Sequence, residues 1–121
     1  MHPTIQIKRA YDPPARTDGL RILVDRLWPR GIKKEDADLD EWAKDLAPTT
    51  ELRQWYGHEP DRWPEFQKKY KGELKHNEAV QTFIEKYQQE KLLTLVYAGK
   101  DEEHTHALVL KEYLDHEFTH R

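Results

Sequence analysis

"KLLTLVYAG", residues 91–99, is the most apolar run in this chain of 121 residues. Its length, its aliphatic and β-branched content and the closing Gly99 predict a buried, central β-strand, because helices of globular proteins are usually longer. The next stretch, residues 101–118, repeats apolar side chains at helical spacing. We expect a helix there, with Asp101 as its N-cap and an inner stripe formed by Ala107, Leu110 and Leu114.

Two further strands are expected near the N-terminus. Residues 4–11 alternate apolar and polar side chains, and residues 20–28 form a second apolar run bounded by Pro29 and Gly31. The segment between them is rich in turn-forming residues, including two prolines and an Asp-Gly pair. A hairpin of these two strands is one arrangement, although its connection would exceed the usual length.

The middle of the chain is predicted to be largely helical. A Thr-Thr-Glu-Leu signature starts a short helix over residues 50–58, and apolar stripes indicate two more over 59–75 and 77–90, the last capped by Asn77. Residues 38–48 fit either an extended or a short helical segment. This order predicts one small α/β domain over residues 1–121, with a short, mostly parallel sheet covered by helices.

Composition narrows the class of protein. Hydrophobic residues make up 36% of the chain and charged residues also 36%, but 4 Trp, 6 Tyr and 3 Phe supply large groups for a core. The chain has no cysteine, which excludes disulfides and thiol chemistry. No signal peptide and no membrane-length apolar run is present. We therefore expect a cytoplasmic protein without membrane association. The sequence indicates no cofactor, and it does not determine the oligomeric state.

The charge is unevenly distributed along the chain. Residues 1–34 hold eight Lys or Arg and three Asp, although the net charge of the whole chain is −3. A basic N-terminal third on an acidic body suggests one face that receives an anion.

The stretch "LVDRLWPRG", residues 23–31, concentrates polar chemistry where the second strand ends. Arg26 and Arg30 can grip a phosphate or carboxylate with charged hydrogen bonds, and Trp28 can offer a flat face to a base or sugar. The alternative is a structural network in which Asp25 pairs with one of the arginines and Trp28 packs in the core. The position at the end of a strand favours a site.

A second candidate segment is "YAGKDEEHTH", residues 97–106, where the central strand leads into the last helix. Free backbone N–H groups at a helix start can bind an anion. His104 and His106 point in divergent directions if the helix has begun, so a metal site is not predicted. One of these histidines can act as a general acid or base, and the alternative is a helix start with hydrogen-bonded histidines.

The third segment, residues 52–63, carries two Trp, one Tyr, His58 and Arg62. Its helical spacing favours packing between two helices over an aromatic wall around a pocket. His58 follows Gly57 in a loop and is the candidate ligand-binding residue of this segment.

Three stretches of this sequence resemble the YeaO-like branch of domain-of-unknown-function family 488. They are residues 23–48, 52–70 and 95–114, and the resemblance extends from about residue 5 to 115. It implies a compact α/β domain of bacterial cytoplasmic proteins with no assigned activity. Longer relatives carry an Asp-x-Arg after the second strand and a Cys-His-Arg segment at the last helix. Here Asp25 and Arg26 are adjacent and the cysteine is absent, so cysteine-dependent chemistry is not implied.

Taken together, these segments predict an enzyme-like domain that binds a small anionic ligand carrying a phosphate or carboxylate, such as a nucleotide. The alternatives are a nucleic-acid-binding or regulatory module that uses the basic third, which is less favoured, and a protein in which the polar cluster is only structural. Ligands of α/β sheets bind beyond the carboxyl ends of parallel strands, so the candidates should converge on one concave surface there. The predicted catalytic residues are Asp25, His104 and His106, and the predicted ligand-binding residues are Arg26, Trp28, Arg30, His58, Tyr97 and Asp101.

Overall fold

A computed structural model describes residues 2–120 of the chain. Within them, four strands form one sheet in the order β1-β4-β2-β3, and every neighbouring pair is parallel. The strands are β1 (Thr4–Arg9), β2 (Leu20–Leu23), β3 (Glu41–Trp42) and β4 (Leu92–Tyr97). The predicted α/β class and the central position of the apolar run are confirmed. The hairpin is wrong, because β4 lies between β1 and β2 and pairs with each of them in parallel.

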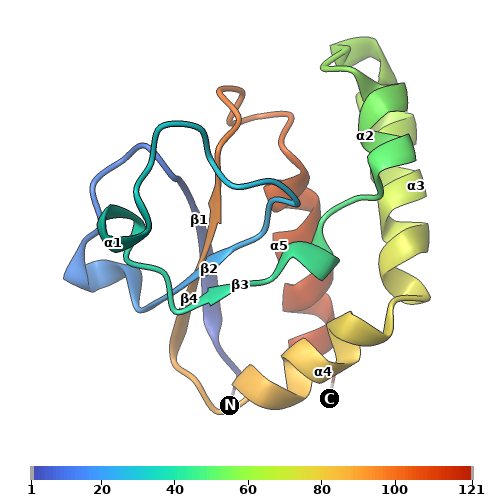
Figure 1. Ribbon diagram of the computed structural model, residues 1–121. Helices are drawn as coiled ribbons and strands as arrows, with labels where there is room; N and C mark the ends of the chain where they lie inside the picture. The colour runs from blue at the N-terminus through green and yellow to red at the C-terminus, as the bar shows by residue number, and fades with distance from the viewer. Residues whose placement is uncertain (1, 121) are drawn as a thin grey trace.

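Five α-helices and three short 3-10 turns connect and cover the strands in the described residues. The helices are α1 (Lys34–Ala37), α2 (Thr50–Tyr56), α3 (Trp63–Lys75), α4 (Glu78–Tyr87) and α5 (His106–Thr119). The 3-10 turns are Arg16–Asp18, Lys44–Leu46 and Pro60–Arg62. The three middle helices lie close to their predicted bounds, and the ambiguous segment contains both β3 and a 3-10 turn. In Figure 1, α3 and α5 lie on one side of the sheet and α1 on the other.

Local hydrogen bonds explain where the middle helices begin and end. The Thr49 hydroxyl accepts from the N–H of Leu52, and Gly57 ends α2 in the left-handed conformation at φ 53°. The Asn77 side chain accepts from the N–H of Ala79 at 2.9 Å, as expected for the N-cap of α4. These caps set the two ends of α2 and the start of α4.

The apolar core lies between the helices and one face of the sheet. Alternate residues of β4 point into it, because successive side chains of a strand face opposite sides. The inward residues include Leu93 and Leu95 of β4, Ile22 of β2, and Tyr70 and Leu110 of the covering helices, all of them fully buried.

The opposite face of the sheet carries a buried polar cluster. The carboxylate of Asp18 forms ion pairs with Arg21 Nη1 at 2.6 Å and with Lys8 Nζ at 3.1 Å. It also accepts a hydrogen bond from the N–H of Ala15. Burial opposes the ionisation of Asp18, but these three donors outweigh it and hold the pKa of its carboxyl below the usual value. Two cations of the basic N-terminal third are therefore engaged inside the fold and do not face a ligand.

Among the described residues, no helix combines the length and the apolar composition needed to cross a membrane.

Candidate functional site

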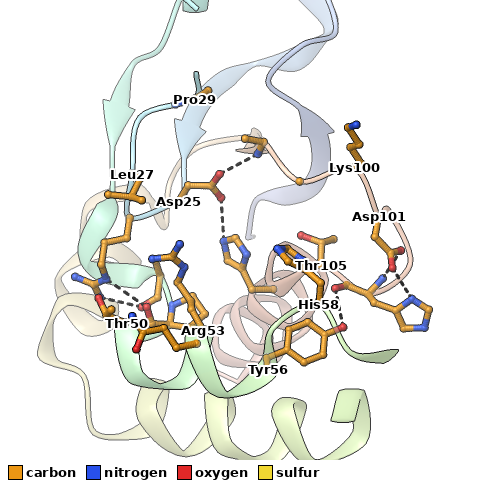
Figure 2. Close-up of a pocket in the computed structure, with 18 of the residues that line it drawn as sticks. Asp25, Leu27, Pro29, Thr50, Arg53, Tyr56, His58, Lys100, Asp101 and Thr105 are labelled. Carbon is orange, nitrogen blue, oxygen red and sulfur yellow. Dashed lines mark hydrogen bonds and ion pairs between the residues drawn. The ribbon is translucent and has the colours of Figure 1, made fainter. Parts of the chain in front are cut away.

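A cleft of about 620 Å³ opens at the carboxyl ends of the strands. Most of its lining comes from three places that are distant in the sequence: the loop after β2, the segment from Ala47 to His58 that includes α2, and the segment from Ala98 to His106 (Figure 2). Tyr11, after β1, and Phe66 of α3 complete it. This is the end of the sheet at which parallel α/β folds bind ligands. Of the predicted site residues, eight line the cleft: Asp25, Arg26, Trp28, Arg30, His58, Asp101, His104 and His106.

Asp25 and His106 connect the loop after β2 to the start of α5. Asp25 Oδ2 accepts from the N–H of Ala98 at 2.9 Å, while His106 Nε2 lies 3.0 Å from the carbonyl oxygen of Val24 and 3.2 Å from Asp25 Oδ1. A carbonyl can only accept, so Nε2 carries a hydrogen and donates it to Val24. Asp25 Oδ1 is therefore close to the ring without a hydrogen bond from any described residue, although it is buried. The second ring nitrogen, Nδ1, is the one left to exchange a proton.

The two arginines of this loop have different surroundings. Arg26 is half-buried, and its guanidinium donates to the carbonyl oxygens of Ala47 and Pro48 at 3.2 and 3.3 Å. Arg30 is exposed, and its guanidinium has no hydrogen bond or ion pair with residues 2–120. Neither arginine pairs with Asp25, so the ion pair assumed in the structural alternative is wrong.

Trp28 is anchored by its own nitrogen. Its Nε1–H donates to the carbonyl oxygen of Ile32 at 2.7 Å, and its ring meets Trp42 edge to face with 5.5 Å between centroids. Trp42 in turn donates to the carbonyl oxygen of Asp25 at 2.8 Å. These bonds fix the loop after β2, so Trp28 lines the cleft as a half-buried wall.

The loop between β4 and α5 corrects one prediction. Asp101 does not cap the helix, because α5 begins at His106 and the Thr105 hydroxyl accepts from the N–H of Ala107. Asp101 instead organises a turn, in which it accepts from the backbone N–H groups of Glu103 and His104 and pairs with the His104 ring at 2.9 Å. The hydrogen bond from His104 is the main reason that the pKa of Asp101 lies below its usual value.

Tyr56, the last residue of α2, and His58, which follows the C-cap, also line the cleft. The Tyr56 hydroxyl donates to the carbonyl oxygen of His104 at 3.4 Å, and burial, with a contribution from the charge of Asp101, raises the pKa of Tyr56. His58 is exposed and has φ 59°, a left-handed conformation that costs energy for a residue with a side chain. Its ring lines the cleft, as labelled in Figure 2.

Tyr97 is the predicted site residue that does not line the cleft. It is 2% exposed and belongs to the apolar core with the other inward-facing residues of β4. Burial is the main cause of the raised pKa of its phenol. The period of the strand explains the difference, since position 97 has the parity of Leu93 and Leu95 and therefore points inward.

Two cations that the sequence analysis passed over also line the cleft. Arg53 projects from α2 into it, and Lys100 follows β4 (Figure 2). Both side chains are exposed and form no hydrogen bond or ion pair in the described part of the chain. In the sequence, Arg53 lies at the flank of the buried stripe of Leu52 and Tyr56, a position that many solvated helix residues share and that does not indicate a site. The cleft lining thus contains four Lys or Arg side chains and two Asp.

Within residues 2–120, no three His, Asp or Glu side chains are grouped so that they could hold a metal ion.

Comparisons with known proteins agree on one family. The family model described as "Inactive DUF488-N3 subclade" (DUF488-N3i) matches residues 4–121. The chain is 46% identical over 110 residues to the uncharacterized protein YeaO of Escherichia coli (strain K12), covering 91% of this chain and 96% of YeaO. It is 40% identical over 111 residues to uncharacterized proteins of Mycobacterium bovis and Mycobacterium tuberculosis, covering 92% of this chain and 93% of theirs. No solved structure gives a significant match.

Proposed function

Because this chain belongs to the DUF488-N3i family, which is described as an inactive subclade, we propose that it is a binding domain: it holds a small anionic ligand in the cleft without transforming it. The ligand carries a phosphate or a carboxylate. The proposal combines the predicted anion site with the family description. It does not include the catalytic roles predicted for Asp25, His104 and His106.

One observation carries this proposal. Arg30, Arg53 and Lys100 line the same cleft, and none of their side chains has a partner among the described residues. Exposed cations are common on any surface, but here they come from three different segments and line one cleft. The four cations of the lining outnumber its two carboxylates, Asp25 and Asp101, and a concave surface with an excess of positive charge attracts an anion. Arginine forks in particular match the geometry of phosphate and carboxylate groups.

The surroundings of the predicted catalytic residues favour binding over catalysis. Asp25 accepts from a backbone N–H, His106 donates to a backbone carbonyl, and His104 pairs with Asp101. These contacts give each residue a positioning role at the cleft. In the catalytic alternative, His106 Nδ1 would be the atom that moves a proton.

The nucleic-acid alternative is less supported. Four of the eight basic residues in the first 34 have partners inside the protein: Lys8, Arg9, Arg21 and Arg26. Binding to a phosphodiester backbone would show a steep dependence on salt, because each neutralised phosphate releases a counter-ion. We expect a shallow dependence for a single small anion.

The proposal is tested by NMR titration of the ¹⁵N-labelled chain with sodium phosphate and sodium acetate, against sodium chloride at equal ionic strength. Amide signals of the three cleft segments should shift together and saturate with one of the two anions. Arg53→Ala should weaken binding by about tenfold, the cost of one charged donor. Lys68→Ala is the matched control and should leave binding unchanged. Lys68 lies outside the cleft, on α3, and its exposed side chain has no partner in residues 2–120.

Two results would contradict the proposal. One is the absence of saturable shifts with either anion, and the other is an equal loss of binding in the Arg53→Ala and Lys68→Ala variants.

A further inference from the structure

Exposed apolar side chains lie beside the cations of the cleft. Among the described residues, the large hydrophobic side chains left exposed are Tyr11 at 48%, Leu27 at 64% and Trp42 at 39%. Tyr11 and Leu27 line the cleft and are exposed, so they form its open edge. Single exposed apolar residues need no explanation, but two at the edge of one concave, cationic site indicate what occupies it.

The exposure of Leu27 is built into the loop. Its neighbours Arg26 and Trp28 are both fixed by hydrogen bonds to backbone carbonyls, with Arg26 directed to Ala47 and Pro48. Leu27 lies between these two anchored residues and is 64% exposed. The loop therefore presents an apolar side chain at a defined position.

Tyr11 is fixed in a similar way. Its hydroxyl donates to the carbonyl oxygen of Arg30 at 2.9 Å, and the Arg9 guanidinium lies over its ring, 5.3 Å from the centroid. The ring thus stands next to Arg30 and is connected to the loop that carries this cation.

Two further aromatic residues line the cleft, but their rings belong to the core. Tyr56 and Phe66 are only 8% and 2% exposed and stack on each other with 4.6 Å between their centroids, so neither offers a free face to a ligand. The apolar groups that stand free beside the cations are therefore Tyr11 and Leu27.

We propose that the ligand is a phosphomonoester of a ring compound, with its phosphate on Arg30, Arg53 and Lys100 and its ring against Tyr11 and Leu27. This inference rests on the proposed function and gives it a ligand class. A phosphomonoester carries close to two negative charges and three terminal oxygens, which suits three free cations better than a carboxylate does. The cleft volume of about 620 Å³ lies within the range of pockets for small molecules, which favours this ligand over a polymer.

The test compares phenyl phosphate, methyl phosphate and phenol by isothermal calorimetry or NMR titration at pH 8, where both esters are dianions. Phenyl phosphate should bind about tenfold more tightly than methyl phosphate, because the ring adds apolar burial that methyl phosphate lacks. Phenol, which has the ring without the charge, should show no saturable binding.

Leu27→Ala separates the two parts of the ligand. This change should reduce phenyl phosphate affinity by about threefold, since it removes a few methyl groups of contact, and should leave methyl phosphate unaffected. Leu27 is exposed, so the variant keeps its fold, which a thermal melt verifies. Arg53→Ala should weaken both esters equally.

The outcomes distinguish this inference from the proposed function. Equal affinity for the two esters, with both weakened by Arg53→Ala, would overturn the ring-binding inference and leave anion binding in place. A failure of both esters to bind would overturn this inference. If acetate also fails to bind, the proposed function is overturned as well. Tight binding of phenyl phosphate that Leu27→Ala does not change would refute the assigned position of the ring.

Discussion

Arg26 and Arg30 lie four residues apart in one loop, and the structure predicts different effects for their removal: loss of stability for Arg26 and loss of anion binding for Arg30. Arg26→Ala deletes two charged hydrogen bonds to the carbonyl oxygens of Ala47 and Pro48. A bond to a charged group contributes about 1.5–3 kcal/mol, but the distances of 3.2 and 3.3 Å and the partial exposure of Arg26 weaken both. We therefore expect the free energy of unfolding to fall by about 1–3 kcal/mol in total.

Arg30→Ala should behave as an ordinary surface change, within about 0.5 kcal/mol of wild type, because the Arg30 side chain has no partner in residues 2–120. Asp25 adds no further cost in either variant, since it pairs with neither arginine. The same Arg30→Ala change should weaken anion binding. Stability and binding are thus assigned to different arginines of the same loop.

Urea unfolding followed by tryptophan fluorescence and far-UV circular dichroism measures both effects, and thermal melts should show a loss of about 4 °C per kcal/mol. Arg26→Lys is the matched control. It keeps the charge but lacks the fork that reaches two carbonyls, so it should recover only part of the loss. A destabilised Arg30→Ala variant together with an unchanged Arg26→Ala variant would refute the assignment.

Three further predictions concern the scaffold around the cleft. The pKa of Asp18 is lowered because its hydrogen-bond donors outweigh the effect of burial. The stability that this carboxylate contributes is therefore present above its ordinary pKa of 3.8 and is lost as the pH falls through the lower pKa of the folded state. Urea unfolding at decreasing pH should show a steeper loss of stability for wild type than for Asp18→Asn, and parallel curves would contradict this. Thr105→Ala should lower the free energy of unfolding by about 1 kcal/mol and fray the start of α5, because it removes the N-cap. Asp101→Ala should leave that helix intact, as judged by NMR secondary shifts. The reverse pattern would identify Asp101 as the cap. Tyr70→Phe should cost about 1–3 kcal/mol in denaturant unfolding, because the buried carbonyl of Leu46 loses its donor at 2.5 Å, and a neutral result would show that water replaces the hydroxyl.

The fold class could be predicted because its strongest signals are local. The apolar run of β4 has no solvent-facing side, which is what a strand flanked by two parallel neighbours requires. The caps of α2 and α4 are equally local, since Thr49 and Asn77 bond to backbone groups within three residues. Strand order is different in kind. β4 enters between β1 and β2 from far along the chain, and the sequence near the N-terminus is equally consistent with a hairpin.

The start of α5 shows why two similar local signals can mislead. Asp101 and Thr105 are both residues that accept hydrogen bonds from backbone N–H groups just ahead of them. Asp101 does so in a turn and Thr105 at the helix. Their sequence signatures are alike, so only the path of the chain between β4 and α5 distinguishes them. The shift moves His106 to the first turn of the helix and leaves His104 in the loop.

The polar residues at the cleft have a common physical origin. Beyond the last ladder hydrogen bond of a sheet, backbone groups of the departing chain still need partners, and a buried group without one is costly. Here Asp25 satisfies the N–H of Ala98, His106 the carbonyl of Val24, and Arg26 the carbonyls of the segment before α2.

Asp25 and His106 therefore substitute for strand pairing where the sheet ends, and Arg26 satisfies carbonyls of the segment before α2. These roles require polar or charged side chains at the edge where a ligand would bind. A sequence shows such residues as a cluster but not which of them already have partners, because the bonds join positions 73 and 82 residues apart. The division into occupied and free groups, with Arg26 on one side and Arg30, Arg53 and Lys100 on the other, is what turns a polar cluster into a specific binding hypothesis.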